Sequence, residues 1–272
     1  MTANPLTTDR IKRLMIFGHP AHELALFGFL QRFQPQIVII TDGGGQERIR
    51  QSRAGLESIG LQATYLMFAE SDFYAALLRR DISFFETVCD SLSLEIAAFQ
   101  PDQIFCDAVE FYNPVHDITL PLVLRAAAAA QSAKIFEVPL VYQTLARGEH
   151  YEIQRTPPDS ARRPFRYHLT SQELRAKVHA RDEIYLSLRD QAGPEFSAVT
   201  AELLATEETV AADDPCAWPH ATGRELRYEW RARLLKQQGA IDEIITHADH
   251  FIPTVQGLLA PRSAAFEAVA KG

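Results

Sequence analysis

The sequence contains few cysteines and no long hydrophobic run. Its three cysteines, Cys89, Cys106 and Cys216, are widely separated and form no Cys-x-x-Cys pair. This pattern argues against a disulfide framework and fits a reducing compartment. No apolar run reaches the roughly 18 to 20 residues that a membrane span requires. The first ten residues also lack an apolar segment of signal-peptide length, so we expect a cytoplasmic protein without a membrane span.

Basic residues are also fewer than acidic residues. The 27 lysines and arginines are outnumbered by 35 aspartates and glutamates, which gives a formal net charge of -8. The basic residues form no long block, so nucleic acid is disfavoured as the main partner. The hydrophobic content of 47% is ordinary for a globular protein and sufficient for a sizeable core.

The glycines do not form a dinucleotide-binding fingerprint. The run Thr41-Asp42-Gly43-Gly44-Gly45 departs from Gly-x-Gly-x-x-Gly, and no acidic residue follows at the distance which that pattern requires. We therefore expect no nucleotide cofactor. The run does follow a predicted strand, where glycine would let the backbone approach a ligand closely.

Short apolar segments alternate with helical patterns in the first half of the chain. We predict strands over residues 11–18, 36–40, 63–68, 102–107 and 134–141, with helices over 47–59, 73–79, 83–99 and 118–131 between them. Repeated strand–helix–strand units predict an α/β fold, with a Rossmann-like, mostly parallel sheet and helices on both faces.

The pattern changes after residue 150. A proline-containing stretch, residues 156–164, is followed by helical segments over 171–188, 197–204 and 224–250, and Ser171 is the candidate N-cap of the first of these. We expect a single domain over residues 1–272, with a core over 11–143 and a mainly helical C-terminal extension over 151–272. A separate second domain is the alternative.

Histidines follow two of the predicted strands. His19 and His22 lie three residues apart in His19-Pro20-Ala21-His22-Glu23, where a strand gives way to a helix, and His116 follows the strand over 102–107. Ligands bind at the carboxyl ends of parallel strands. Three imidazoles that leave one position open are typical of a catalytic Zn²⁺ site, in which the metal polarises a carbonyl and lowers the pKa of water. We predict that these histidines hold Zn²⁺ or another divalent metal.

A second pair, His247 and His250, has the same spacing. It lies inside a predicted helix and follows no strand, so we expect it to be a solvated helix face.

These motifs, taken in order, resemble the PIG-L/LmbE-like family of zinc-dependent N-deacetylases. The family has His-Pro-Asp-Asp-Glu after a strand, Thr-Asp-Gly after the next strand, and later a Pro-Asp strand that leads into His-Pro-Asp-His. The counterparts in this chain are residues 19–23, 41–43, 101–106 and 113–116. The resemblance covers residues 11–130. It implies metal ligands at His19, His22 and His116 and hydrolysis of an N-acetylated amino sugar.

The sequence departs from the family pattern at two catalytic positions. The slot of the family's general base is Ala21, which cannot take a proton, and the histidine that steadies the oxyanion corresponds to Asn113. Losing a positioned base typically costs about 10² to 10⁴ in rate. Glu23 is the nearest replacement in the sequence. Glu110, Asp117 and Asp42 are the alternatives, and the sequence does not rank them.

The resemblance also suggests a substrate-binding set, made of Asp42, Arg50, Asp72 and Tyr112. With Glu23 and Asn113 as catalytic residues, the leading hypothesis is a metal-dependent hydrolase that removes an N-acyl group from an amino-sugar conjugate. Two alternatives stay open: another metal-assisted reaction in a glycan or natural-product pathway, and a non-catalytic relative that binds a sugar or a partner. The sequence leaves open whether the chain forms a homo-oligomer.

Overall fold

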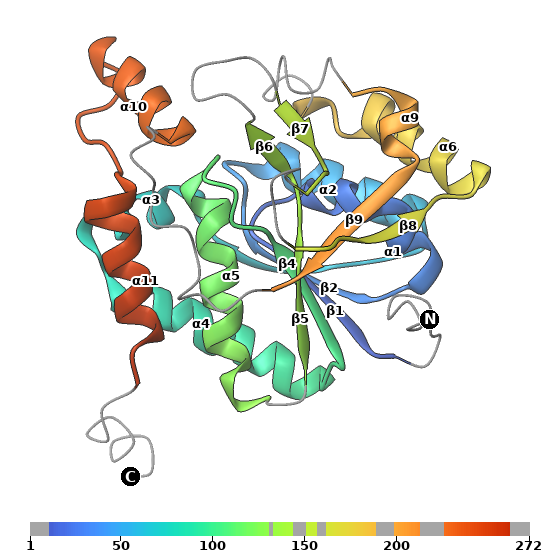
Figure 1. The fold of residues 1–272 in the computed structure, drawn as a ribbon, viewed down its shortest axis with the longest axis horizontal. Coiled ribbons are helices and arrows are strands. Elements are labelled where there is room, and N and C mark those ends of the chain that lie inside the picture. Colours follow the sequence, from blue (N-terminus) through green and yellow to red (C-terminus); the bar gives the residue numbers. More distant parts are fainter. Residues whose placement is uncertain are drawn as a thin grey trace.

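The computed structural model describes residues 11–130, 133–143, 151–156, 162–188, 199–212 and 226–261 (Figure 1). The strands are β1 (Arg13–Phe17), β2 (Gln36–Thr41), β3 (Thr64–Phe68), β4 (Gln103–Asp107), β5 (Lys134–Val138), β6 (Val141–Gln143), β7 (Tyr151–Ile153), β8 (Phe165–His168) and β9 (Thr206–Ala211). The α-helices are α1 (Phe27–Phe33), α2 (Gln46–Ser58), α3 (Glu70–Arg79), α4 (Ile82–Phe99), α5 (Pro114–Ala126), α6 (Ser171–His179), α9 (Ala201–Leu204), α10 (Arg227–Gln237) and α11 (Ile252–Leu259).

Seven strands form one mixed sheet in the order β3-β2-β1-β4-β5-β9-β8, while β6 and β7 form a separate antiparallel pair. The strands β1 to β5 are all parallel, and β9 and β8 join them in antiparallel pairing. The predicted fold class, a mostly parallel α/β sheet surrounded by helices, is confirmed. The chain runs outward from β1 to β2 and β3 on one side and from β4 to β5 on the other. The topological switch point therefore lies between β1 and β4.

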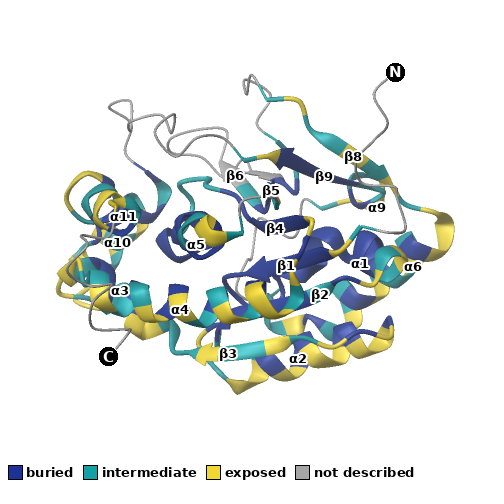
Figure 2. Cartoon of the chain, turned by 90° about the horizontal axis from the view of Figure 1, so that it is seen from below, coloured by how far each residue is buried: buried dark blue, intermediate teal, exposed yellow. Residues whose placement is uncertain are grey.

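Helices cover both faces of this sheet. Successive residues of each strand point to opposite sides, so each strand contributes side chains to two cores. Leu14 and Ile16 of β1 belong to the core beneath α3, α4, α5 and α11. Met15 and Phe17 belong to the core on the other face, beneath α1 and α2. Figure 2 shows the central strands as a buried layer between the two sets of helices. Strands covered on both faces read as continuous apolar runs, which is why the sequence predicted them.

The second half of the chain contributes more strand than the sequence suggested. The segment after α9, for which no element was predicted, forms β9, and β8 pairs with it. Its sequence, Thr-Glu-Glu-Thr-Val-Ala, has no apolar alternation. Glu207 is buried in it, where Lys177 of α6 forms an ion pair with the carboxylate at 2.9 Å. The predicted helix over 224–250 is also shorter, because α10 ends at Gln237.

No helix in the described part of the chain is both long and apolar enough to cross a membrane.

Candidate metal centre

Three histidines meet above the switch point of the sheet. His19 lies two residues after the end of β1, and His22 opens the 3-10 helix His22–Leu26. His116 lies in the first turn of α5, which begins at Pro114 and is capped by the Asn113 side chain through the N–H of Val115. All three side chains are buried. The elements that carry them follow the carboxyl ends of β1 and β4, which are neighbours in the sheet.

The approach to His22 requires an unusual backbone conformation. Ala21 has φ 82° and ψ -7°, which places it in the left-handed region. Residues other than glycine seldom adopt this region, and such conformations concentrate at functional sites. The helix expected to follow the first strand therefore starts as a 3-10 turn, and the α-helix proper begins at Phe27.

The three rings converge on one point. One nitrogen from each of His19, His22 and His116 lies within 4.8 Å of the other two, and this is the only such group of ligand atoms among the described residues. The ring centroids are 4.3 to 5.0 Å apart. His19 Nε2 and His116 Nδ1 are buried without a hydrogen-bond partner. Buried imidazole nitrogens with free lone pairs fit a divalent metal, and zinc suits this donor set.

The Nδ1 atoms of His19 and His22 are hydrogen-bonded to residues at the ends of β2 and β4. His19 Nδ1 lies 2.9 Å from Thr41 Oγ1, whose single proton is donated to Gly18 O at 2.7 Å. The Thr41 hydroxyl must therefore accept the Nδ1–H of His19, which leaves His19 Nε2 unprotonated. His22 Nδ1 lies 2.8 Å from Asp107 Oδ2. Such carboxylate–histidine pairs fix the ring orientation and raise the basicity of the inner nitrogen.

Gly18 makes the arrangement around Asp107 possible. Its N–H donates to Asp107 Oδ2 at 2.8 Å. A Cβ at this position would lie 2.7 Å from Thr119 Oγ1 and 2.9 Å from Asp107 Oδ2. Glycine is therefore needed for close approach between the β1 end and α5.

Burial controls the charge of the ligand group. Desolvation lowers the pKa of His19, His22 and His116 well below the ordinary value, and mutual repulsion with the neighbouring rings adds to the effect for His19 and His116. The imidazoles are therefore neutral near neutral pH, which is the state that binds metal.

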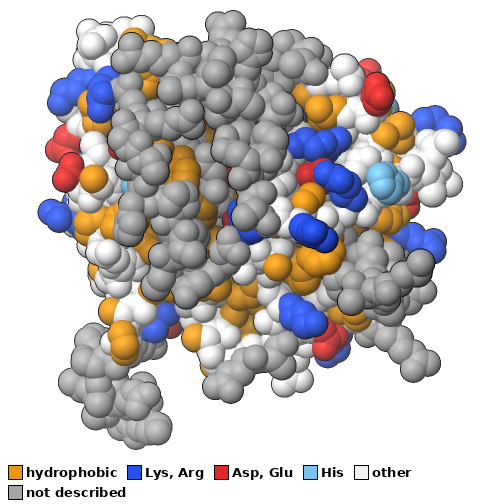
Figure 3. Space-filling view, viewed as in Figure 1, with side chains coloured by type: hydrophobic (Ala, Val, Ile, Leu, Met, Phe, Trp, Pro, Cys, Tyr) orange, Lys and Arg blue, Asp and Glu red, His pale blue; other side chains and the backbone are white. Residues whose placement is uncertain are grey.

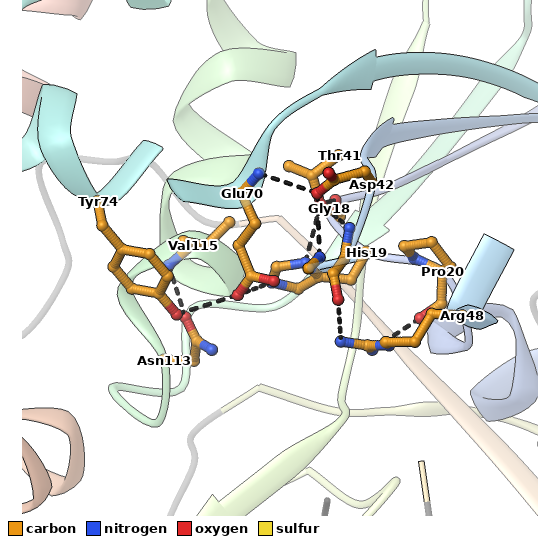
Figure 4. A network of polar contacts seen from close by, with 12 residues as sticks. Gly18, His19, Pro20, Thr41, Asp42, Arg48, Glu70, Tyr74, Asn113 and Val115 are labelled. Atoms are coloured by element: carbon orange, nitrogen blue, oxygen red, sulfur yellow. Dashed lines mark hydrogen bonds and ion pairs between the residues drawn. The ribbon is translucent and has the colours of Figure 1, made fainter. Parts of the chain in front are cut away.

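One carboxylate lies beside this group, and the sequence did not single it out. Glu70 Oε1 is 3.8 Å from His19 Nε2, and it accepts a hydrogen bond from the Tyr74 hydroxyl at 3.1 Å. Figure 4 shows the Glu70 side chain between His19 and Tyr74, with Asn113 next to the Tyr74 hydroxyl. Burial raises the pKa of Glu70, and the Arg48 charge opposes this shift. Glu70 is the first residue of α3, directly after β3, so the strand-end rule could have identified it.

The other carboxylates considered for the base role are occupied by structural hydrogen bonds. Glu23 Oε1 accepts from Ser52 and Tyr185, at 2.5 and 2.9 Å. The remaining three, Glu110, Asp117 and Asp42, all accept backbone N–H groups of loops around the site. None of these four carboxylates, nor Glu70 itself, lines the cavity next to the histidines, and Glu70 differs from them by its 3.8 Å approach to His19 Nε2.

The predicted substrate-binding residues separate into two groups. Tyr112 lines the cavity, as does Asn113, which was predicted to be catalytic, and the Tyr112 ring lies 6.0 Å from that of His116. Asp42 does not line the cavity. Arg50 is exposed and pairs with Glu47 on the outer face of α2, and Asp72 is exposed in the first turn of α3. On α2 it is Arg48 that faces the cavity, where its guanidinium donates to Pro20 O at 2.8 Å and Gly43 O at 3.2 Å. Spacing along α2 could not distinguish these two arginines.

The second histidine pair is not a solvated helix face. His247 is buried, and its ring lies 5.1 Å from Phe111 and 5.5 Å from Phe251. The expectation failed because the segment His247–Phe251 is a single π-helical turn that packs against the core before α11. Neither histidine belongs to the convergent ligand group.

A cavity of about 980 Å³ opens from the histidines toward α3 and α10. His22 and His116 lie in its wall with Arg48, Tyr74 and Asn113. This volume is at the upper end of the range for small-molecule sites. The arrangement can thus hold a metal at one end of a cavity that accommodates a sizeable organic molecule.

Comparison with known proteins gives structural but no sequence relatives. No family model and no curated protein sequence matches the chain. The solved structures that resemble it include the A40926 pseudoaglycone deacetylase Dbv21, with a TM-score of 0.55 and 13% identity over 76% of this chain and 100% of that one. Teicoplanin deacetylase structures include a complex named deacetylase-bog and the zinc-inhibited form of Orf2, both with a TM-score of 0.52 and 13% identity over 75% of this chain and 99% of theirs. At this identity the likeness shows a shared fold.

Proposed function

We propose that this protein is a metal-dependent hydrolase that removes an N-acyl group, with acetyl as the first candidate, from an amino sugar or a related conjugate. The observation that carries the proposal is the group of three buried imidazoles above the switch point. Further support comes from the motifs over residues 11–130, which resemble zinc-dependent N-deacetylases. The fold shared with three solved deacetylase structures agrees with this reading.

His19, His22 and His116 would hold the metal, with Thr41 and Asp107 orienting the first two rings. A zinc ion bound there supplies Lewis acidity, which polarises the amide carbonyl and makes water easier to deprotonate. Burial keeps the three ligands neutral, so the full charge of the ion acts on the substrate.

Glu70 is our candidate for the proton-transfer role that Ala21 cannot fill. Its carboxylate lies beside His19, and burial raises its pKa toward the range in which it can both accept and release a proton. Tyr74 holds one oxygen of the carboxylate in place. Glu70 would take a proton from the attacking water and deliver it to the leaving amine.

Asn113 and Glu23 have different parts in this proposal. Asn113 lines the cavity with its Oδ1 engaged as the cap of α5 and its side chain hydrogen-bonded to Tyr74, so we assign the second N–H of its amide to stabilising an oxyanion. Glu23 follows His22 in the chain and is fixed by Ser52 and Tyr185, so we assign it the role of positioning the His22 turn.

The direct experiment measures acetate release from a panel of N-acetylated amino sugars by the zinc-loaded protein. We expect release that stops when a chelator removes the metal and returns when zinc is restored. The Glu70→Gln variant should keep its metal and lose about 10² to 10⁴ in kcat, the usual contribution of a positioned base. Glu47→Gln, on the exposed face of α2, is the matched control.

Two results would refute parts of this account. A Glu70→Gln protein with full activity would show that Glu70 is not the base, and loss of metal in that variant would make Glu70 a ligand instead. A metal-loaded protein that releases no acetate from any member of the panel would favour a different metal-assisted reaction in a glycan or natural-product pathway. Ala21 in the usual base slot is the observation that favours that second candidate.

A further inference from the structure

Glu70 is set apart from the cavity in which a substrate would bind. Its Oε1 lies 3.8 Å from His19 Nε2, so the carboxylate can meet a molecule as small as water beside that histidine. The side chains that line the cavity include His22, His116 and Tyr74 but not Glu70. Direct proton transfer needs about 2.6–3.2 Å between heavy atoms. A proton held by Glu70 therefore needs a carrier to reach a leaving amine in the cavity.

Tyr74 connects Glu70 to the cavity. Glu70 is the first residue of α3 and Tyr74 lies four residues later, so the two side chains share one helix face. The Tyr74 hydroxyl donates to Glu70 Oε1 at 3.1 Å, and Tyr74 itself lines the cavity. The Asn113 side chain is hydrogen-bonded to Tyr74 as well. Figure 4 shows the hydroxyl end of Tyr74 close to both side chains.

The hydrogen bonds in this chain run in one direction. A carboxylate can only accept, so the single proton of the Tyr74 hydroxyl is the one that Glu70 receives. Asn113 must then donate to the Tyr74 oxygen through its amide nitrogen, because its Oδ1 accepts the N–H of Val115 at 2.8 Å. The cap of α5 thus holds the Tyr74 oxygen in place whichever way its proton points.

Tyr74 itself stays protonated. Burial raises the pKa of Tyr74 well above the ordinary value for tyrosine, and the charge of Glu70 adds to this shift. Tyr74 is therefore unable to act as a base alone, since a phenolate at this position is unfavourable. A neutral hydroxyl can give its proton to a substrate only while it receives another one, and Glu70 is the neighbour that can supply it.

The cavity offers few other sources of a proton. The acidic side chains in the described part of its wall are Asp242 and Glu243, and both are exposed on the segment after α10. Figure 3 shows that acidic side chains also form only small, separate groups among the described residues of that face. The arginines of the wall cannot release a proton near neutral pH. Tyr74 is thus the cavity residue with a described connection to a buried carboxylate.

We propose that Tyr74 is a catalytic residue that relays a proton from Glu70 to the leaving amine. This inference rests on the proposed function and adds a residue to it. When the C–N bond breaks, its electron pair stays on the nitrogen, which takes the proton of the Tyr74 hydroxyl. Tyr74 Oη takes in the same step the proton that Glu70 received from the attacking water. The products are the free amine and the carboxylic acid, and Glu70 and Tyr74 return to carboxylate and neutral phenol.

The dependence on the leaving group tests the relay. The amine of an N-acetylated amino sugar needs a proton to leave, whereas p-nitrophenyl acetate releases a phenolate that needs none. Tyr74→Phe should lower kcat for the amide by about 10² to 10⁴ and keep the zinc-dependent kcat for the ester within about twofold. Glu70→Gln should lower both, because both reactions need water to be deprotonated.

Tyr167→Phe is the matched control, and all variants are compared at equal zinc content. Its hydroxyl also donates to a glutamate, Glu173, at 2.7 Å, but it lies on β8 outside the cavity, so both activities should persist. Equal losses for amide and ester in Tyr74→Phe would make Tyr74 a positioning residue, and full amide activity would remove it from the reaction. Either result overturns the relay alone. A wild type that hydrolyses neither substrate refutes the proposed function and the relay with it.

Infrared spectroscopy of the metal-free protein tests the hydrogen-bond chain without turnover. The C–O stretch of a tyrosine depends on whether its hydroxyl donates, accepts or does both. The difference spectrum between a protein and its Tyr74→Phe counterpart isolates the Tyr74 band. Glu70→Gln replaces a charged acceptor by a neutral one and should shift this band, while Glu173→Gln should leave it unchanged. A band that does not move in Glu70→Gln would show that Tyr74 does not donate to Glu70, which overturns the proposal.

Discussion

The two halves of the chain build the candidate site in different ways. Residues 11–143 provide five parallel strands, and the three histidines and Glu70 lie at the carboxyl ends of strands in this half. Residues 151–261 provide the two antiparallel strands of the large sheet, β8 and β9, and the α10 side of the cavity. The candidate metal ligands therefore come from short motifs at strand ends, whereas the shape of the cavity depends on tertiary packing of segments that carry no motif.

A buried ion pair within the second half is hydrogen-bonded to the first half and so joins the two. Lys177 Nζ lies 2.9 Å from Glu207 Oε1 and donates to Ala25 O at 2.9 Å, and both charged side chains are fully buried. The Glu207 carboxylate also accepts the N–H groups of Gly28 and Phe29 at the start of α1. The second half thus fixes the turn that follows His22, the only histidine of the ligand group that lies in a 3-10 helix.

The largest effect on stability is expected from breaking this pair. Lys177→Met leaves the Glu207 charge buried without its partner, which should lower the free energy of unfolding by about 3–5 kcal/mol. Urea denaturation measures the change. The double variant Lys177→Met/Glu207→Gln should recover part of the loss, because no buried charge then lacks a counterion. A single variant as stable as the wild type would show that the halves are not joined through this pair.

Arg48 should matter more than its neighbour Arg50. Arg48→Ala removes charged hydrogen bonds to Pro20 O and Gly43 O, which join the loops after β1 and β2, and each such bond contributes about 1.5–3 kcal/mol. We expect a clear drop in the urea midpoint for Arg48→Ala and none for Arg50→Ala on the exposed face of the same helix. Equal midpoints would contradict the separation of these two arginines by the fold.

Within the first half, Asp107 should tune metal affinity without being a ligand. Asp107→Asn weakens the orientation of His22 and should reduce zinc affinity by about 10- to 100-fold, as measured by competition with a chromogenic chelator. Asp102→Asn makes the same change at the residue that precedes β4, at the other end of the strand. Asp102 accepts the N–H of Lys12, and this substitution should leave the zinc affinity unchanged. If the two variants bind zinc equally well, Asp107 does not orient His22.

The smallest effect concerns the start of α6 in the second half. Thr170 and Glu173 form a capping box, in which each side chain accepts the backbone N–H of the other residue. Thr170→Ala should therefore cost about 1 kcal/mol of unfolding free energy. Ser171, which the sequence suggested as the cap, is the control: Ser171→Ala should change the stability less. The reverse order would place the cap at Ser171.

The strand pattern and the histidines could be predicted because their signals are local. The central strands β1, β2 and β4 are buried on both faces and therefore read as apolar runs. His19, His22 and His116 follow two of these runs, so the strand-end rule placed them at one edge of the sheet. The ligand role of the histidines remains a prediction, and so does the single-domain organisation.

The features that the sequence did not predict depend on long-range contacts. β9 has no apolar alternation, and its place in the sheet depends on pairing with β5 and β8 and on Lys177, which neutralises the buried Glu207. Glu70 lies two residues after Phe68, the last residue of β3, in a segment without a motif. The pairing of β3 with β2 brings it toward the site. Arg48 and Arg50 differ by two positions on α2, so their exposure is decided by which helix face packs on the sheet.

Metal content tests the central claim most directly. After expression in zinc-supplemented medium, elemental analysis should find about one zinc per wild-type chain, as expected for a site with three protein ligands. His116→Ala should fall below a tenth of the wild-type content, while His168→Ala, at an exposed position on β8, should match the wild type. A wild-type protein without metal, or a His116→Ala variant that retains all of it, would contradict the account.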